Sequence, residues 1–89
     1  SKKEAIEYGY EFIAKDMDLE IDYVTVFDPV KVPAGDWRKS VPFDEESYKI
    51  WEMHVPSEKI RRAGIDNFWG PTGSDGPCGP TTEIYVSGI

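Results

Sequence analysis

The sequence predicts an α+β fold, because two helical patterns alternate with strand-like runs along its 89 residues. Apolar residues recur at helical spacing over residues 1–17, whereas residues 21–27 and 81–86 are rich in the β-branched and aromatic side chains that favour strands. A chain of this length removes only a modest fraction of its surface from water. We therefore expect one domain at most, residues 1–89, with a small core.

The first helix is predicted to begin with a capping box. Ser1 and Glu4 have the spacing at which each side chain accepts a hydrogen bond from the other's backbone N–H. Apolar residues at helical spacing then indicate the face that packs on the core. They are Ile6, Tyr10, Ile13 and Met17, with Ala5, Gly9 and Phe12 beside them.

Residues 21–27 show little alternation of polar and apolar side chains, which predicts an interior strand covered on both faces. Asp28 and Pro29 end this strand, and residues 28–43 follow with several prolines and no sustained period. We interpret residues 28–43 as an insertion loop on the surface. Its apolar side chains, which can fold back onto the body, are Val30, Val32, Trp37 and Val41.

A second helix is predicted to start after Asp44, an N-cap residue followed by two glutamates near the positive end of the helix dipole. Tyr48, Ile50 and Trp51 are expected to face inward from this helix. The elements expected after it are a short helical piece within 55–59, a brief strand at 60–63 and a closing strand at 81–86.

Residues 70–80 form the most informative segment, because they are dominated by glycine and proline and lie between Phe68-Trp69 and the closing strand. Glycine allows backbone conformations that other residues avoid and lets a ligand approach the main chain, while proline stiffens the chain. Such a segment, anchored at both ends, predicts a shaped loop that a rigid scaffold presents to a small molecule.

In this region the chain resembles the catalytic domain of the alanyl-tRNA synthetase family, which belongs to the class II aminoacyl-tRNA synthetases. Four blocks match the family's pattern in the family's order and cover most of the chain. They are Lys2-Lys3-Glu4-Ala5-Ile6, Tyr23-Val24-Thr25-Val26-Phe27, Asp44-Glu45-Glu46-Ser47-Tyr48-Lys49-Ile50-Trp51, and Asn67-Phe68-Trp69 with Gly73 and Gly76-Pro77-Cys78-Gly79-Pro80-Thr81-Thr82-Glu83-Ile84.

The resemblance places the chain between motif 2 and motif 3 of that domain, as part of an antiparallel sheet with flanking helices. It implies a full-length ligase that activates alanine with ATP and Mg²⁺ and transfers it to tRNA(Ala) in protein biosynthesis. No arginine here matches the catalytic arginines of motif 2 or motif 3, so we assign no catalytic residue and expect the isolated chain to be inactive. The alternative is a stand-alone, non-catalytic binding or interaction module derived from the synthetase.

The resemblance also suggests substrate-binding residues. Trp69 matches the family's tryptophan that lines the amino-acid pocket, and the alternative is a tryptophan of the core. Gly73, Asp75 and Gly76 can offer backbone N–H groups and a carboxylate to the substrates, although a plain turn is an equal alternative. Glu83 is expected either to point toward the substrates or to hydrogen-bond the loop backbone.

A zinc site is not predicted. Many family members have a second cysteine where Thr81 stands, and a tetrahedral zinc needs about four ligands. His54 is the only histidine, and we expect it to be an exposed or capping residue at the end of the second helix. Cys78 is better explained by the packing of a small residue than by nucleophilic catalysis.

The formal net charge of -7 argues against a nucleic-acid footprint in this segment, because phosphate binding needs clustered lysine and arginine. Residues 59–62 are the nearest approach to a cluster, and we interpret them as a solvated helix end or turn. A single cysteine, no signal peptide and no membrane-spanning stretch favour a cytoplasmic protein that does not contact a membrane. Strand edges left exposed in so small a piece would favour self-association.

Overall fold

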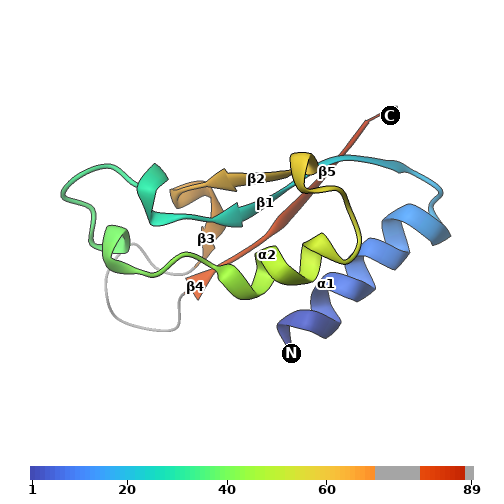
Figure 1. Ribbon diagram of the computed structural model, residues 1–89, viewed down its shortest axis with the longest axis horizontal. Coiled ribbons are helices and arrows are strands. Elements are labelled where there is room, and N and C mark those ends of the chain that lie inside the picture. Colours follow the sequence, from blue (N-terminus) through green and yellow to red (C-terminus); the bar gives the residue numbers. More distant parts are fainter. Residues whose placement is uncertain (70–78, 88–89) are drawn as a thin grey trace.

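A computed structural model describes residues 1–69 and 79–87 of the chain, except for the side chains of Phe68 and Trp69. Two α-helices, α1 (Lys2–Glu11) and α2 (Glu45–Glu52), pack on each other and on one face of a three-stranded sheet (Figure 1). This arrangement confirms the predicted α+β class. Within the described residues, no helix is long and apolar enough to cross a membrane.

The sheet has the strand order β2-β1-β5, with β1 (Glu20–Phe27) in the centre. β5 (Glu83–Ser87) pairs antiparallel to β1, as expected, whereas β2 (Ile60–Ala63) pairs parallel to it. The parallel pair follows from the connection between the two strands, which crosses over through α2. A second, two-stranded sheet joins β3 (Phe68–Trp69) to β4 (Gly79–Pro80).

The capping box at the start of α1 is confirmed, since Ser1 Oγ accepts a hydrogen bond from the Glu4 N–H at 3.3 Å. The α-helix ends earlier than the apolar pattern predicts, because Phe12–Asp16 form a π-helical turn. A π-turn adds a residue to the turn and rotates the following side chains off the original stripe. The expectation that Phe12 and Met17 face the core is therefore wrong, and they are 48% and 50% exposed.

β1 is the interior strand that its composition predicts. Val24, Val26 and Phe27 are fully buried. A register shift between Ile21 and Tyr23 places Ile21 in the same core cluster as Val24, although three positions separate them. From the helices, Ile6, Ile50 and Trp51 complete this core as expected.

Residues 28–43 form two 3-10 turns rather than an open loop, Pro29–Lys31 and Trp37–Ser40. Val32 is buried, which confirms that the segment folds back at one point, whereas Val30 is 69% exposed. Trp37 is 39% exposed and is not among the described residues of the core cluster.

Asp28 ties this excursion to the sheet. Its carboxylate caps the first 3-10 turn through the Val30 N–H and lies 2.8 Å from the Arg62 guanidinium of β2. Burial is the largest single influence and raises the pKa of Asp28. The hydrogen bonds from Val30 and Arg62 and the charges of Arg62 and Lys31 together outweigh burial, so the pKa lies below its ordinary value of 3.8.

We expect Asp28→Asn to lower the free energy of unfolding by about 1 kcal/mol at neutral pH, since the Arg62 end of the pair is half-exposed. A carboxylate whose pKa is lowered by folding stabilises the protein above its unfolded pKa and loses that effect as the pH falls through its folded pKa. Denaturant unfolding should therefore show the variant and the original chain converging in strong acid. Asp22→Asn makes the same change at an exposed position of β1 and serves as the control, and a deficit as large at position 22 would contradict the tie to β2.

Candidate functional site

The two faces of the sheet differ in character. Ile84 of β5 faces Gly9 of α1, whereas Glu83 and Tyr85, one residue to either side, are exposed on the opposite face. Tyr85 stacks on Tyr23 of β1 with the ring centroids 4.6 Å apart. The face away from the helices is therefore the polar, accessible one, and it carries the predicted site residue Glu83.

The accessible face is locally acidic around Glu83. The Glu83 carboxylate accepts a hydrogen bond from the Tyr85 hydroxyl at 3.2 Å. The negative charge of Glu83 raises the pKa of Tyr85, and partial burial, this hydrogen bond and the nearby charges of Tyr23 and Asp66 add to the effect. An ammonium group would be favoured at such a position.

Asn67 joins the residues on both sides of segment 70–78. It is only 1% exposed. Its amide nitrogen donates to the Thr81 carbonyl at 3.0 Å and lies 2.7 Å from the hydroxyl of Thr25, which in turn donates to the amide oxygen. The Thr81 N–H donates back to the Asn67 carbonyl at 2.8 Å. One buried side chain therefore joins Thr81, on the far side of segment 70–78, to Thr25 of the central strand, and we call this group the Asn67 clamp.

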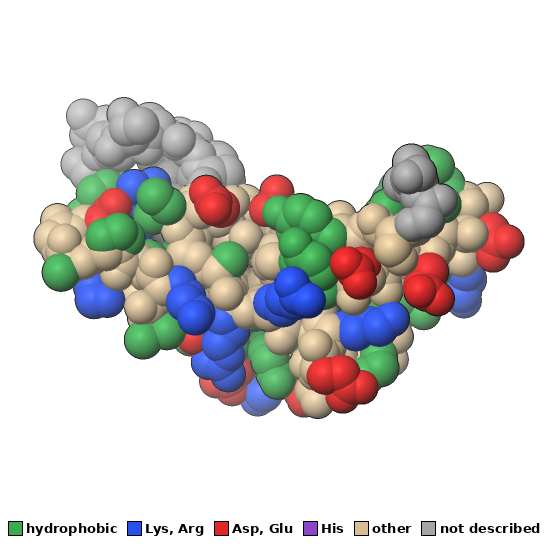
Figure 2. Space-filling model, turned by 90° about the horizontal axis from the view of Figure 1, so that it is seen from above, with side chains coloured by type: hydrophobic (Ala, Val, Ile, Leu, Met, Phe, Trp, Pro, Cys, Tyr) green, Lys and Arg blue, Asp and Glu red, His purple; other side chains and the backbone are tan. Residues whose placement is uncertain are grey.

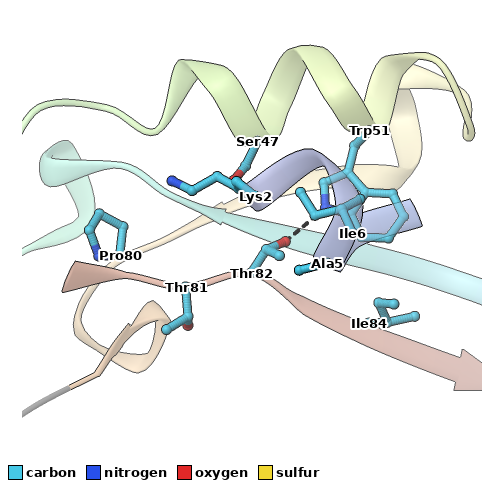
Figure 3. Close-up of a pocket in the computed structure, with 9 residues that line it drawn as sticks. All are labelled: Lys2, Ala5, Ile6, Ser47, Trp51, Pro80, Thr81, Thr82 and Ile84. Carbon is cyan, nitrogen blue, oxygen red and sulfur yellow. Dashed lines mark hydrogen bonds between the residues drawn. The ribbon is translucent and has the colours of Figure 1, made fainter. Parts of the chain in front are cut away.

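Thr82 anchors the same segment to the helix layer. Its hydroxyl accepts a hydrogen bond from the Trp51 indole N–H at 2.8 Å (Figure 3). The same hydroxyl donates to the Thr25 carbonyl. Trp51 is fully buried, so this hydrogen bond satisfies the one polar atom of its side chain. Residues 81 and 82 are thus held from both sides of the sheet.

The predicted site residues are only partly described. The backbone of Trp69 pairs with Gly79, in β3 and β4. Next to this pair, the Thr81 N–H donates to the Asn67 carbonyl of the Asn67 clamp. The Trp69 side chain and all of Gly73, Asp75 and Gly76 lie outside the described residues. The structure therefore brings the flanks of the loop to the same end of the sheet as Glu83, and the role of each of these residues stays a prediction.

Sequence reasoning missed the residues of the Asn67 clamp. Asn67 and Thr25 each belong to a block that resembles the family, but the sequence predicts no side-chain contact for either. The sequence offers two signals for this cluster. One is a polar residue directly before an aromatic pair, and the other is a lone threonine in a buried strand. Their partnership depends on contacts between positions 42 residues apart, which no local pattern shows.

A cavity of about 440 Å³ lies on the other side of β5, between α1, α2 and the start of the strand (Figure 3). The described residues that line it include Ile6, Trp51 and Ile84, but not Glu83. Lys2 at its rim is bound to the buried Asp44 at 3.0 Å, and Ser47 donates to the same carboxylate at 2.7 Å. This cavity is therefore distinct from the accessible face and is mainly apolar.

His54 follows α2, and its N–H donates to the Trp51 carbonyl, as expected at a helix end. Its ring, however, is largely covered. It is tilted by 30° against the Tyr10 ring, and Nε2 lies 3.4 Å from a Glu7 oxygen. Among the described residues, no three histidine, cysteine, aspartate or glutamate side chains gather as a metal site would need. Cys78 lies outside them, so the absence of zinc stays a prediction.

The basic residues of segment 59–62 each contact another part of the chain. Arg61 and Arg62 lie in β2 and not in a solvated helix end, and Lys59 ends the 3-10 turn before β2. Lys59 donates to the Ile21 carbonyl, Arg61 lies 3.8 Å above the Tyr23 ring, and Arg62 binds Asp28. In the view of Figure 2, basic and acidic side chains are interspersed rather than gathered by sign. These contacts favour a structural role for the cluster.

Comparison with known proteins agrees with this geometry. The family model described as tRNA synthetases class II (A) matches residues 1–88. The chain belongs to this family. Three similar proteins are the alanine–tRNA ligases of Borreliella afzelii (strain PKo), Myxococcus xanthus (strain DK1622) and Treponema denticola (strain ATCC 35405), with 41%, 40% and 39% identity.

The alignments with these three ligases cover 94–96% of the chain. The chain, in contrast, spans only 9–14% of the length of these class II synthetase relatives. It is therefore homologous to a short segment of the alanine–tRNA ligases.

Proposed function

We propose that the chain supplies part of the amino-acid pocket of an alanine–tRNA ligase, with Trp69 as a wall and Glu83 near the substrate. The observation that carries the proposal is the Asn67 clamp, which holds the residues around the Gly-Pro segment beside the accessible face of the sheet. A rigid flank of this kind is what a pocket for a small substrate requires.

The chemistry of the accessible face fits the α-amino group of alanine. Glu83 is an exposed carboxylate in acidic surroundings, and a carboxylate paired with an ammonium group makes a charge-assisted hydrogen bond. Gly73, Asp75 and Gly76 would complete the site from the loop. A tryptophan wall excludes larger side chains but separates small ones by only about 1–3 kcal/mol, so glycine and serine would compete with alanine.

ATP with Mg²⁺ and tRNA(Ala) would be substrates of the whole ligase. Adenylate formation requires groups that position and neutralise the phosphates, and the chain has no counterpart of the family's motif 2 and motif 3 arginines. We therefore assign binding, and not catalysis, to the 89-residue chain.

Alanine titration followed by tryptophan fluorescence tests the proposal. We expect a saturable change with L-alanine that is lost in Trp69→Phe and persists in Trp37→Phe, because Trp37 belongs to the 3-10 turn Trp37–Ser40 and is not one of the proposed pocket residues. L-leucine should give no saturable change, since the wall excludes it. Alanine-dependent pyrophosphate exchange should stay at background. A response to alanine that survives Trp69→Phe, or no response of the original chain, would refute the assignment of Trp69 as a pocket wall.

A further inference from the structure

Glu83 lies beside the Asn67 clamp on the accessible face of the sheet. In the register of the two strands, Glu83 of β5 is directly opposite Thr25 of β1, the residue that binds the Asn67 side chain. Directly paired residues place their side chains on the same face. The register alone does not fix the carboxylate, because the long side chain of an exposed glutamate rotates freely unless another group holds it.

Tyr85 supplies that group. It is two residues further along β5, so its side chain points to the same face as Glu83. The Tyr85 hydroxyl donates a hydrogen bond to Oε1 of Glu83 at 3.2 Å. Within the described part of the chain, the Glu83 side chain makes no other hydrogen bond and no ion pair, so Oε2 is left for a ligand.

The ring of Tyr85 is held by a row of planar groups across the sheet. It stacks on Tyr23 of β1, with the ring centroids 4.6 Å apart and an angle of 16° between the planes. The guanidinium of Arg61, on β2, lies 3.8 Å from the centroid of the Tyr23 ring. Stacking and cation–π attraction are both favourable at exposed sites, so the row sets the direction in which the Tyr85 hydroxyl points.

The same row keeps Arg61 away from Glu83. Arg61 and Glu83 flank Thr25 in the sheet register, one on each neighbouring strand. The guanidinium lies over the Tyr23 ring instead of pairing with the Glu83 carboxylate. Glu83 therefore keeps its negative charge, and this charge raises the pKa of Tyr85 and so keeps the phenol protonated as a donor.

We propose that Tyr85 is a positioning residue: its hydroxyl holds Oε1 of Glu83 so that Oε2 is turned toward the α-amino group of a bound amino acid. The inference rests on the proposed function, in which Glu83 lies near alanine. A carboxylate that is held before binding has less rotational freedom to lose when it pairs with the ammonium group, so the amino acid binds more tightly. Tyr85 does not itself touch the amino acid, and Tyr23 and Arg61 act through Tyr85.

The contact between Tyr85 and Glu83 can be tested without a ligand. NMR titration of isotope-labelled tyrosine follows the Tyr85 phenol in the original chain and in Glu83→Ala. The variant removes the charge that contributes most to the raised pKa of Tyr85, so we expect the phenol to titrate at lower pH. An unchanged titration would show that the two side chains do not meet in solution and would overturn the proposal.

Alanine binding tests the positioning role. Tyr85→Phe removes the hydroxyl and keeps the ring that stacks on Tyr23. In the tryptophan-fluorescence titration, we expect it to weaken L-alanine binding about three- to tenfold, while the midpoint of denaturant unfolding stays the same. Tyr8→Phe makes the same change at an exposed position of α1 and should leave alanine binding as it is.

The two proposals fail in different ways. An unchanged affinity in Tyr85→Phe would overturn the positioning role and leave the amino-acid pocket standing. No saturable response of the original chain would refute the pocket and the positioning role together.

A double-mutant cycle shows whether the hydroxyl acts through Glu83. Once Glu83→Ala is present, adding Tyr85→Phe should change the affinity for L-alanine by less than about twofold, because no carboxylate is left to hold. A further loss as large as the loss caused by Tyr85→Phe alone would mean that the hydroxyl acts by another route and would overturn the proposal.

Discussion

Asn67→Asp is expected to lower the free energy of unfolding by about 2–4 kcal/mol at neutral pH, one of the two largest effects in this chain. The change is nearly isosteric, but it removes the N–H donor that binds the Thr81 carbonyl and the Thr25 hydroxyl. It also places a negative charge where the side chain is 1% exposed. Denaturant unfolding followed by circular dichroism measures the loss, and a change under about 0.5 kcal/mol would contradict the Asn67 clamp.

The deficit of Asn67→Asp should shrink as the pH is lowered. Burial raises the pKa of the new carboxyl above its value in the unfolded chain, so the penalty is complete above the folded pKa and declines as the folded state takes up a proton. The protonated carboxyl can also donate a hydrogen bond, as the amide does. A deficit that stays constant down to acid pH would show that the lost amide donor, and not the charge, causes it.

Thr25 supplies matched controls for the same cluster. Thr25→Ser keeps the hydroxyl that contacts Asn67, whereas Thr25→Val keeps the shape and removes the hydroxyl. If hydrogen bonding carries the energy of the Asn67 clamp, the valine variant should be the less stable of the two, despite its better strand propensity.

Trp51→Ala is expected to prevent stable folding. The side chain is fully buried at the centre of the core between α1, α2 and β1, and truncating a buried tryptophan costs about 3–5 kcal/mol. A domain of this size has a total stability of only about 4–13 kcal/mol. The variant also leaves the Thr82 hydroxyl without its indole donor. Near-ultraviolet circular dichroism and thermal unfolding should show a loss of fixed tertiary structure.

Trp51→Phe separates the hydrogen bond from the packing. It keeps most of the apolar volume and removes only the indole N–H, so we expect a loss of about 1–2 kcal/mol. Trp37→Phe is the control at an exposed tryptophan and should change stability by less than about 0.5 kcal/mol. A loss at position 37 that equals the loss at position 51 would contradict the central place of Trp51 in the core.

Local elements of the fold are readable in the sequence because neighbours along the chain determine them. The capping box at Ser1, the cap at Asp44 and the apolar run of β1 each need only a few adjacent residues, and all three are present as predicted. The π-helical turn at Phe12–Asp16 departs from such a pattern, because the apolar residues there fit an uninterrupted α-helix equally well.

The candidate site also has a part that the sequence predicts and a part that only the tertiary structure shows. The motif around Trp69 and Glu83 was visible in the sequence, since it lies within one short stretch of chain. The sequence by itself also determined the family and the order of the two α-helices and of the strands β1, β2 and β5, but not the β3–β4 pair. Only the tertiary structure decided that β2 pairs parallel to β1 and that the side chain of Asn67 binds both Thr25 and Thr81. These features depend on which residues, distant along the chain, come together when the core forms, and a local pattern carries no information about that choice.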